Sequence, residues 1–278
     1  QLNAHLTPSS THSKVGVDHY ENFPVASFLC PAHLRPAVQA LYWFARTGDD
    51  IADEGDAPYE LRIQTLRAYK ADLNASIQNQ PTSLEWAGIF HNLALVLKAY
   101  PISPQYLVDL LSAFEQDIEY TEKKQLYPNR QALIEYCQLS ANPVGRLMLQ
   151  MNHVQDEAAF LLSDKVCTGL QLVNFWQDLS KDLARERNYL PQNELAKRQL
   201  IGSAPITEQL NQEQYHAQWA NVIESELIYA VEQLQSGRAV VKYLPTRMAW
   251  ELRLVIEAAL HVAKKIKKMK HQTFLNRP

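Results

Sequence analysis

Short breaks that contain proline divide this chain of 278 residues into eight long, largely apolar segments. This division limits the fold more than any other feature, because proline fixes its backbone and lacks an amide hydrogen. Only eight residues are glycine, and no segment alternates polar and β-branched residues as a half-buried strand would. The segments therefore predict an all-α fold. Helices are expected over residues 33–54, 60–77, 83–99, 104–125, 130–151, 156–182, 207–235 and 246–270, with Ser103 and Thr246 as N-caps.

Length and composition favour one large core, since 46% of the residues are hydrophobic. Residues 17–278 are predicted to form a single all-α domain, and residues 1–16, which lack the apolar core of a signal peptide, a flexible tail. No apolar run is long enough to span a membrane. A net charge of −3 argues against a nucleic-acid partner. The three cysteines have unrelated spacings, which indicates reduced thiols in a cytoplasmic protein rather than a zinc site.

The first acidic motif lies at the end of the first long segment. Its polar residues are spaced four, three and four apart, so they share one helix face: Tyr42, Arg46, Asp49 and Asp53. Two carboxylates one turn apart repel each other on a buried face, and a divalent cation such as Mg²⁺ would relieve that repulsion. The alternative is a solvated acidic helix end, although acidic residues there oppose the helix dipole.

The second acidic motif lies on the segment 156–182. Gln171, Asn174, Asp178 and Asp182 are spaced three, four and four apart on an otherwise apolar helix. A basic stretch follows directly and contains Arg185, Arg187 and Tyr189. Cations beside a carboxylate–metal site suit a polyphosphate. The alternative is an amphipathic helix with Asp–Arg ion pairs, but two such motifs about 125 residues apart favour a multi-metal diphosphate clamp across a helical bundle.

These motifs, in this order and spacing, resemble the squalene/phytoene synthase family over most of the chain. The resemblance is carried by Arg46–Asp53 (RTGDDIAD), by Tyr136-Cys137 followed by Val144-Gly145, by the second motif and by Glu186–Pro191 (ERNYLP). Asp18–Ser27 and Ser140–Gly145 are similar to the hydroxysqualene-forming members of bacterial hopanoid pathways. The chain departs from squalene and dehydrosqualene synthases at Asn22, Asn142-Pro143 and Gln177. The family implies an isoprenoid synthase bundle with a central cavity.

The resemblance implies that presqualene diphosphate loses diphosphate, the carbocation rearranges, and water captures it to give hydroxysqualene. Two or three Mg²⁺ ions would be held by Asp49, Asp50, Asp53, Asn174, Asp178 and Asp182. The diphosphate would be bound by Arg46, Arg185, Arg187, Tyr189 and Gln171. The catalytic residues would be Tyr136, Asp49, Asp53, Asp178 and Asp182, and the cavity would be lined by Phe23, Tyr42, Asn142, Phe175 and Arg253. NADPH is not expected.

Alternatives remain for the reaction and for two features of the last helix. The same site could join two farnesyl or geranylgeranyl diphosphates head to head, and a non-enzymatic assembly factor is a third hypothesis. Arg253 could instead form an ion pair with Glu257, four residues on. The lysines of Lys264–Lys270 could be a solvated helix end or a patch for transient contact with the inner face of the membrane. Enzymes upstream and downstream of squalene are possible partners.

Overall fold

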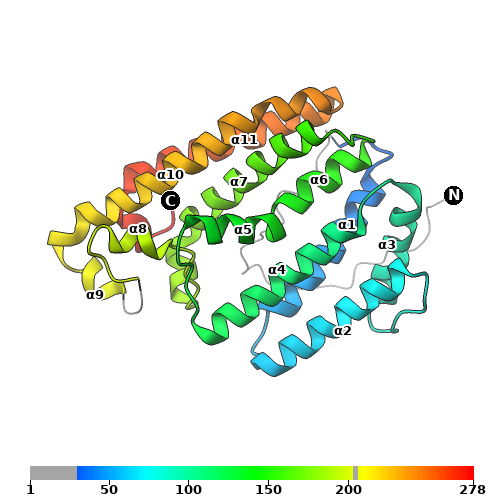
Figure 1. Ribbon diagram of the computed structural model, residues 1–278, viewed down its shortest axis with the longest axis horizontal. Coiled ribbons are helices and arrows are strands. Elements are labelled where there is room, and N and C mark those ends of the chain that lie inside the picture. Colours follow the sequence, from blue (N-terminus) through cyan, green and yellow to red (C-terminus); the bar gives the residue numbers. More distant parts are fainter. Residues whose placement is uncertain (1–29, 203–205) are drawn as a thin grey trace.

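The computed structural model describes residues 30–202 and 206–278, and within these ranges every regular element is a helix (Figure 1). The all-α prediction is therefore confirmed. The α-helices are α1 (Arg35–Asp53), α2 (Tyr59–Ile77), α3 (Ala87–Ala99), α4 (Pro104–Lys123), α5 (Arg130–Ser140), α6 (Asn142–Met151), α7 (Glu157–Ala184), α8 (Gln192–Ala196), α9 (Ile206–Leu210), α10 (His216–Gly237) and α11 (Thr246–Met269). Short 3-10 helices are η1 (Glu213–Tyr215), η2 (Arg238–Tyr243) and η3 (Lys270–Phe274).

The stretch predicted as one helix over residues 130–151 is two helices. Helix α5 ends at Ser140 and α6 begins at Asn142, with Ala141 between them at φ −118° and ψ −51°. Pro143 lacks the amide hydrogen that a continuous helix would need there, so the chain turns. The break between the two helices therefore falls at Asn142-Pro143.

Two details of the helix ends correct the sequence predictions. Thr246 is the first residue of α11 rather than its N-cap, which is Pro245. Ser103 does occupy the N-cap position of α4, but its side chain makes no capping hydrogen bond. The stretch predicted as one helix over residues 207–235 is divided into α9, η1 and α10. Helix α8 was not predicted, because five residues are too few to show helical periodicity.

The buried side chains form two clusters. One joins α1, α2, α3 and α4 around aromatic residues such as Phe44, Tyr69 and Phe90. The other surrounds α7 and includes residues of α5, α10 and α11. Figure 1 shows α1–α4 on one side, α7, α10 and α11 on the other, and α5 and α6 between them. The site described below lies where α1 and α4 meet the segment that follows α7.

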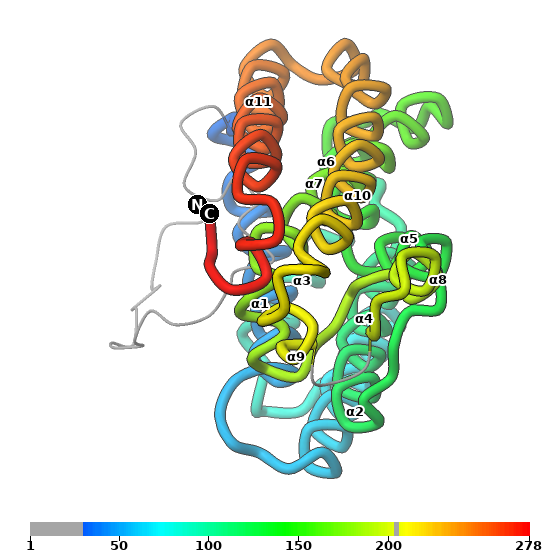
Figure 2. Tube along the Cα trace, turned by 90° about the vertical axis from the view of Figure 1, so that its left-hand side faces the viewer, coloured from blue at the N-terminus to red at the C-terminus, as the bar shows by residue number. Residues whose placement is uncertain are grey.

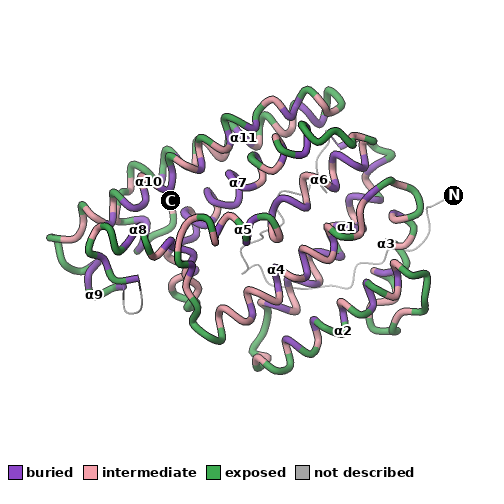
Figure 3. The backbone as a smooth tube through the Cα atoms, viewed as in Figure 1, coloured by how far each residue is buried: buried purple, intermediate pink, exposed green. Residues whose placement is uncertain are grey.

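Helix α7 is the central element of the second cluster. It packs against α5, α6, α10 and α11, and also against η2 and η3. Figure 2 shows α10 and α11 running alongside one another, and Figure 3 shows buried residues along α7 while the outer faces of α10 and α11 are exposed. A helix held from several sides provides a rigid support for polar residues that must keep fixed positions.

Close packing of α10 on α7 depends on Gly237. A Cβ atom at this position would lie 2.6 Å from the backbone oxygen of Leu162 and 2.9 Å from the backbone nitrogen of Val166. Backbone atoms cannot rotate away as side-chain ends can. Gly237→Ala should therefore lower the free energy of unfolding by about 1–3 kcal/mol, as overpacking does.

Urea denaturation of the purified protein would measure this loss. Gly88→Ala is the matched control, because a Cβ atom at Gly88 on α3 would meet nothing within 4 Å. Alanine there should be neutral or stabilise by up to about 1 kcal/mol. Equal effects of the two substitutions would contradict the packing argument.

Candidate active site

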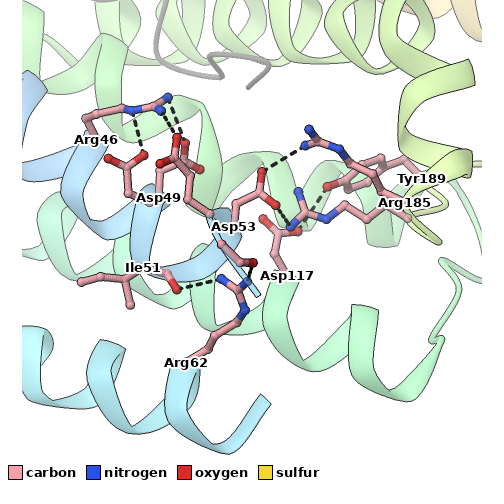
Figure 4. A network of polar contacts seen from close by, with 12 residues as sticks. Arg46, Asp49, Ile51, Asp53, Arg62, Asp117, Arg185 and Tyr189 are labelled. Carbon is pink, nitrogen blue, oxygen red and sulfur yellow. Dashed lines mark hydrogen bonds and ion pairs between the residues drawn. The ribbon is translucent and has the colours of Figure 1, made fainter. Parts of the chain in front are cut away.

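The first acidic motif occupies the end of α1, where Arg46 gathers three carboxylates (Figure 4). Its Nε lies 2.8 Å from Asp50 Oδ1, its Nη2 2.7 Å from Glu54 Oε1, and its Nη1 3.7 Å from Asp49 Oδ2. Asp49 is buried. The guanidinium group therefore offsets part of the repulsion that the helical spacing of the carboxylates creates.

Arg62 of α2 holds the backbone directly after this motif. Its guanidinium group donates to the carbonyl oxygens of Ile51 at 3.2 Å, Gly55 at 2.5 Å and Ala57 at 3.0 Å. Gly55 has φ +71°, a conformation that glycine adopts at little cost. A cation at the carboxyl end of a helix interacts favourably with its dipole, so Arg62 fixes the position at which α1 ends. Sequence analysis did not identify this role.

Asp53 connects the first motif to the segment after α7. Its Oδ1 lies 2.7 Å from Arg187 Nη2, and its Oδ2 lies 3.4 Å from Arg185 Nη1. The backbone amides of Arg185 and Arg187 both donate to the carbonyl oxygen of Asp182, at 3.0 and 2.8 Å. Asp53 therefore lies next to the turn that follows the second motif, and two distant parts of the sequence meet through arginine (Figure 4).

Asp117 of α4 is a central residue of the site that the sequence analysis missed. Its carboxylate accepts a hydrogen bond from Tyr136 Oη at 2.5 Å and one from Tyr189 Oη at 3.3 Å. A signal existed, because Asp117 follows the buried residues Ala113 and Phe114 by one helical turn. A single acidic residue on an apolar face gives too weak a pattern to select without a partner.

Aromatic rings surround the two tyrosines that bind Asp117. The rings of Phe175 and Tyr189 stack with centroids 4.0 Å apart, and Tyr136 lies 6.0 Å from Tyr189. Tyr127 lies 5.9 Å from both Tyr136 and Tyr189. All four rings are buried. An aromatic wall therefore adjoins the polar part of the site, and aromatic faces can stabilise a nearby cation.

The second acidic motif is buried on α7. Asp178 Oδ1 lies 2.5 Å from Arg277 Nε, in the segment after α11. Asp182 Oδ2 is buried and has no hydrogen-bond partner among the described residues. A buried carboxylate oxygen without a partner is costly, and a bound cation would remove that cost.

Burial raises the pKa of several carboxyl groups in the site. The pKa of Asp49 rises to about 8, because the group is desolvated and lies near Asp53, although Arg46 lowers it in part. Burial raises the pKa of Asp182 to about 7, against the influence of Arg187. Burial likewise raises the pKa of Asp117 to about 6 and that of Asp178 above its usual value. Such a cluster is typical of functional sites and favours a bound cation.

The described residues contain no group of three acidic, cysteine or histidine side chains close enough to hold a metal ion as they stand. Arginines pair with the carboxylates instead: Arg46 at Asp49 and Asp50, Arg187 at Asp53, and Arg277 at Asp178. The donor set is nevertheless suited to a hard divalent cation, since it consists of carboxylate oxygens. The unpartnered Asp182 Oδ2 is the most direct indication.

The other residues predicted for the site lie in different surroundings. Gln171 is buried on α7, Asn174 is half-buried on the same helix, and Tyr42 is half-buried on α1. Asn142 is buried, and its Oδ1 accepts a hydrogen bond from Thr168 Oγ1 at 3.0 Å. This contact joins α6 to α7. Phe23 lies outside the described residues.

Arg253 is placed differently from both predictions made for it. Its side chain is exposed on α11 and lies over the exposed ring of Trp250, 5.3 Å from the ring centroid. Glu257, its expected partner, forms its ion pair with Arg238 of η2. The i to i+4 spacing made the Arg253–Glu257 pair possible, but Arg238 of the neighbouring η2 binds Glu257 instead.

The arrangement of helices and acidic motifs defines the class of this protein as an all-α isoprenoid synthase. The chain belongs to the squalene/phytoene synthase family, whose model matches residues 17–278. Its fold is similar to that of the crystal structure of squalene synthase HpnC from Alicyclobacillus acidocaldarius. The TM-score is 0.77 at 28% sequence identity, over 91% of this chain and 90% of the other.

Two relatives of similar sequence are hydroxysqualene synthases. The protein from Sinorhizobium fredii is 31% identical over 95% of this chain and 84% of its own length. The protein from Zymomonas mobilis is 35% identical over 62% of this chain, a match that spans only about half (54%) of the relative. These matches support the family resemblance found in the sequence.

The raised pKa of Asp117 predicts a pH-dependent contribution to stability. The unfolded carboxyl group titrates near pH 4, while the folded one keeps its proton up to about pH 6. The folded state thus binds more protons between these values, and the wild type loses stability as pH rises through this window. Asp117→Asn does not titrate, so its stability relative to wild type should rise from pH 4 to pH 6 and then level off.

Urea denaturation across this pH range, with EDTA present, would test this prediction. Asp109→Asn on the same helix is the control for this type of substitution, because Asp109 accepts a hydrogen bond from Gln105 one turn away and does not contact Tyr136 or Tyr189 among the described residues. If the difference in free energy of unfolding between Asp117→Asn and wild type does not change with pH, the raised pKa of Asp117 is contradicted.

Proposed function

We propose that this protein converts presqualene diphosphate and water into hydroxysqualene and diphosphate. The single observation that carries the proposal is the meeting of the two acidic motifs, in which Asp53 of α1 binds Arg185 and Arg187 beside Asp182. The hydroxysqualene synthases among its relatives support this choice of reaction within the family.

The first step is the departure of diphosphate. Asp49, Asp53, Asp178 and Asp182, with Asp50 and Asn174 beside them, would hold two or three Mg²⁺ ions. These ions, when bound, supply positive charge to the leaving oxygens. The chain itself supplies Arg46, Arg185 and Arg187, which can exchange a carboxylate partner for a phosphate oxygen. The carbon–oxygen bond breaks and its electron pair leaves with diphosphate.

The second step is the protection of the carbocation. The stacked rings of Phe175 and Tyr189, with Tyr136 beside them, offer aromatic faces worth up to about 2 kcal/mol each when desolvated. The hydrogen bond from Tyr136 to Asp117 fixes the orientation of the phenol group. Water then forms the new carbon–oxygen bond and loses a proton. The net reaction is redox-neutral and requires no NADPH.

A second candidate is the head-to-head condensation of two prenyl diphosphates, because the family description includes phytoene synthases. This reaction would use the same acidic motifs. Purified protein supplied with farnesyl diphosphate and Mg²⁺ would then release presqualene diphosphate, whereas the main proposal requires presqualene diphosphate as substrate. An assembly factor without catalysis would have no use for the buried carboxylates.

Removal of one carboxylate from either motif should abolish turnover. Asp49→Asn and Asp178→Asn should each lower the rate of hydroxysqualene formation from presqualene diphosphate by on the order of a hundredfold or more, because each loses a metal-binding oxygen. Product would be measured in lipid extracts, and circular dichroism would check the fold. Asp109→Asn should retain wild-type activity. Full activity in both motif variants, or no hydroxylated C30 product from wild type, would refute the proposal.

Peripheral contact with the membrane is a further part of the proposal, since both substrate and product carry C30 chains. Among the described residues, no helix combines the length and the apolar character needed to cross a bilayer. Helix α11 does expose Trp250 and Leu254, at 56% and 61%, and further along it exposes Lys264, Lys265 and Lys268. A helix that exposes aromatic and apolar side chains near one end and lysines near the other suits an anionic membrane surface. A cytoplasmic protein at the inner leaflet, near other enzymes of squalene metabolism, would fit this surface.

Substitution of this surface should weaken binding to vesicles. Replacement of Lys264, Lys265 and Lys268 by Gln together should reduce co-sedimentation with vesicles that contain phosphatidylglycerol by on the order of tenfold or more. Leu254→Ala should also weaken binding, through loss of buried apolar area. Leu84→Ala is the matched control, since Leu84 is 94% exposed in a loop before α3. Binding that is unchanged in all variants would exclude α11 as the contact surface.

A further inference from the structure

The segment after α11 turns back onto α7 and brings Arg277 to the second acidic motif. Arg277 Nε lies 2.5 Å from Asp178 Oδ1. Asp178 is 3% exposed, whereas the side chain of Arg277 is 43% exposed. The contact joins a buried carboxylate to a half-exposed guanidinium group. Arg277 thus reaches into the site from its rim.

Buried anchors hold this segment a few residues before Arg277. Thr273 is fully buried and its Oγ1 donates to the carbonyl oxygen of Trp176 at 3.3 Å. Phe274 packs edge-on against Trp219, with ring centroids 4.8 Å apart. Three residues of chain can extend about 10 Å at most. Arg277 can therefore change partners within the site while the anchors keep the start of the segment against α7.

A metal ion bound to the same oxygen of Asp178 would compete with Arg277 for that oxygen. Two cations on one carboxylate oxygen repel each other, and the guanidinium group is the one that solvent can reach. Its planar donors match phosphate oxygens as well as they match a carboxylate. Because the side chain of Arg277 is 43% exposed, water can solvate its guanidinium group when it leaves Asp178.

We propose that Arg277 is a further diphosphate-binding residue of this site. In the ligand-free protein its guanidinium group neutralises Asp178. When a divalent cation binds Asp178, the group turns to the phosphate oxygens of the bound diphosphate. The proposal rests on the proposed function, since it requires that the acidic motifs bind metal and diphosphate. A role that is only structural, in which Arg277 holds the segment against α7, makes different predictions.

The decisive experiment measures two affinities of the Arg277→Gln variant of this chain. Binding of Mn²⁺ alone, followed by electron paramagnetic resonance, should become several-fold tighter, because a competing cation has left Asp178. Binding of inorganic pyrophosphate in the presence of Mg²⁺, followed by calorimetry, should become weaker by on the order of tenfold, because a charged hydrogen-bond donor is lost. Arg277→Lys should fall between the variant and wild type in both measurements.

Arg238→Gln is the matched control. Arg238 is 47% exposed and also forms an ion pair with a carboxylate, that of Glu257, which belongs to neither acidic motif. Loss of the Arg238 side chain should leave the affinities for Mn²⁺ and for pyrophosphate unchanged. Circular dichroism and thermal unfolding would confirm that the variants fold, which the exposure of both arginines favours.

The opposite signs of the two changes distinguish the proposal from its alternative. If both affinities are unchanged in Arg277→Gln, or if both fall, the proposed role of Arg277 is overturned. In that case the binding of Mn²⁺ and pyrophosphate by the wild type would still support the proposed function. Wild-type protein that binds neither ligand would overturn the proposed function and this inference together.

Discussion

The structure depends on how a helical core accommodates several buried carboxylates. Asp49, Asp178 and Asp182 lie on helices whose other faces pack in apolar clusters, and desolvation raises the pKa of each. Arginines compensate for much of this charge, and each arrives from a different segment: Arg46 from α1 itself, Arg187 from the turn after α7, and Arg277 from the segment after α11. A site of this kind is held together by the same charges that would bind metal and diphosphate.

The two apolar clusters give this polar centre its rigidity. Helix α7 is packed on several sides, and Gly237 allows α10 to approach it closely. On the other side, Arg62 fixes the end of α1 by binding three carbonyl oxygens. Asp117 joins the polar centre to the aromatic wall through Tyr136 and Tyr189. Acidic, basic and aromatic groups are thereby kept in one place, as diphosphate ionisation and carbocation protection would require.

Much of the fold and part of the site could be predicted from the sequence. Proline and helical periodicity located the long helices, although the stretch predicted as one helix over residues 130–151 is broken at Asn142-Pro143. The resemblance carried by Arg46–Asp53 and Glu186–Pro191 indicated the family that the comparison confirmed. The roles of Asp117, Arg62 and Arg277 could not be predicted, because each is a single polar residue whose importance comes from partners far away in the sequence. Spacing alone made an Arg253–Glu257 pair possible, although Arg238 binds Glu257.

The sequence by itself determined which residues share a helix face, because the period of the α-helix fixes that from spacing alone. It thereby placed Asp49 with Asp53 and Asp178 with Asp182. Only the tertiary structure decided which arginine meets which carboxylate, that Asp117 binds two tyrosines, and that Arg277 returns to α7. These contacts depend on the path of the chain between helices, which local spacing does not encode. Their strength also depends on burial, which appears only when the helices pack.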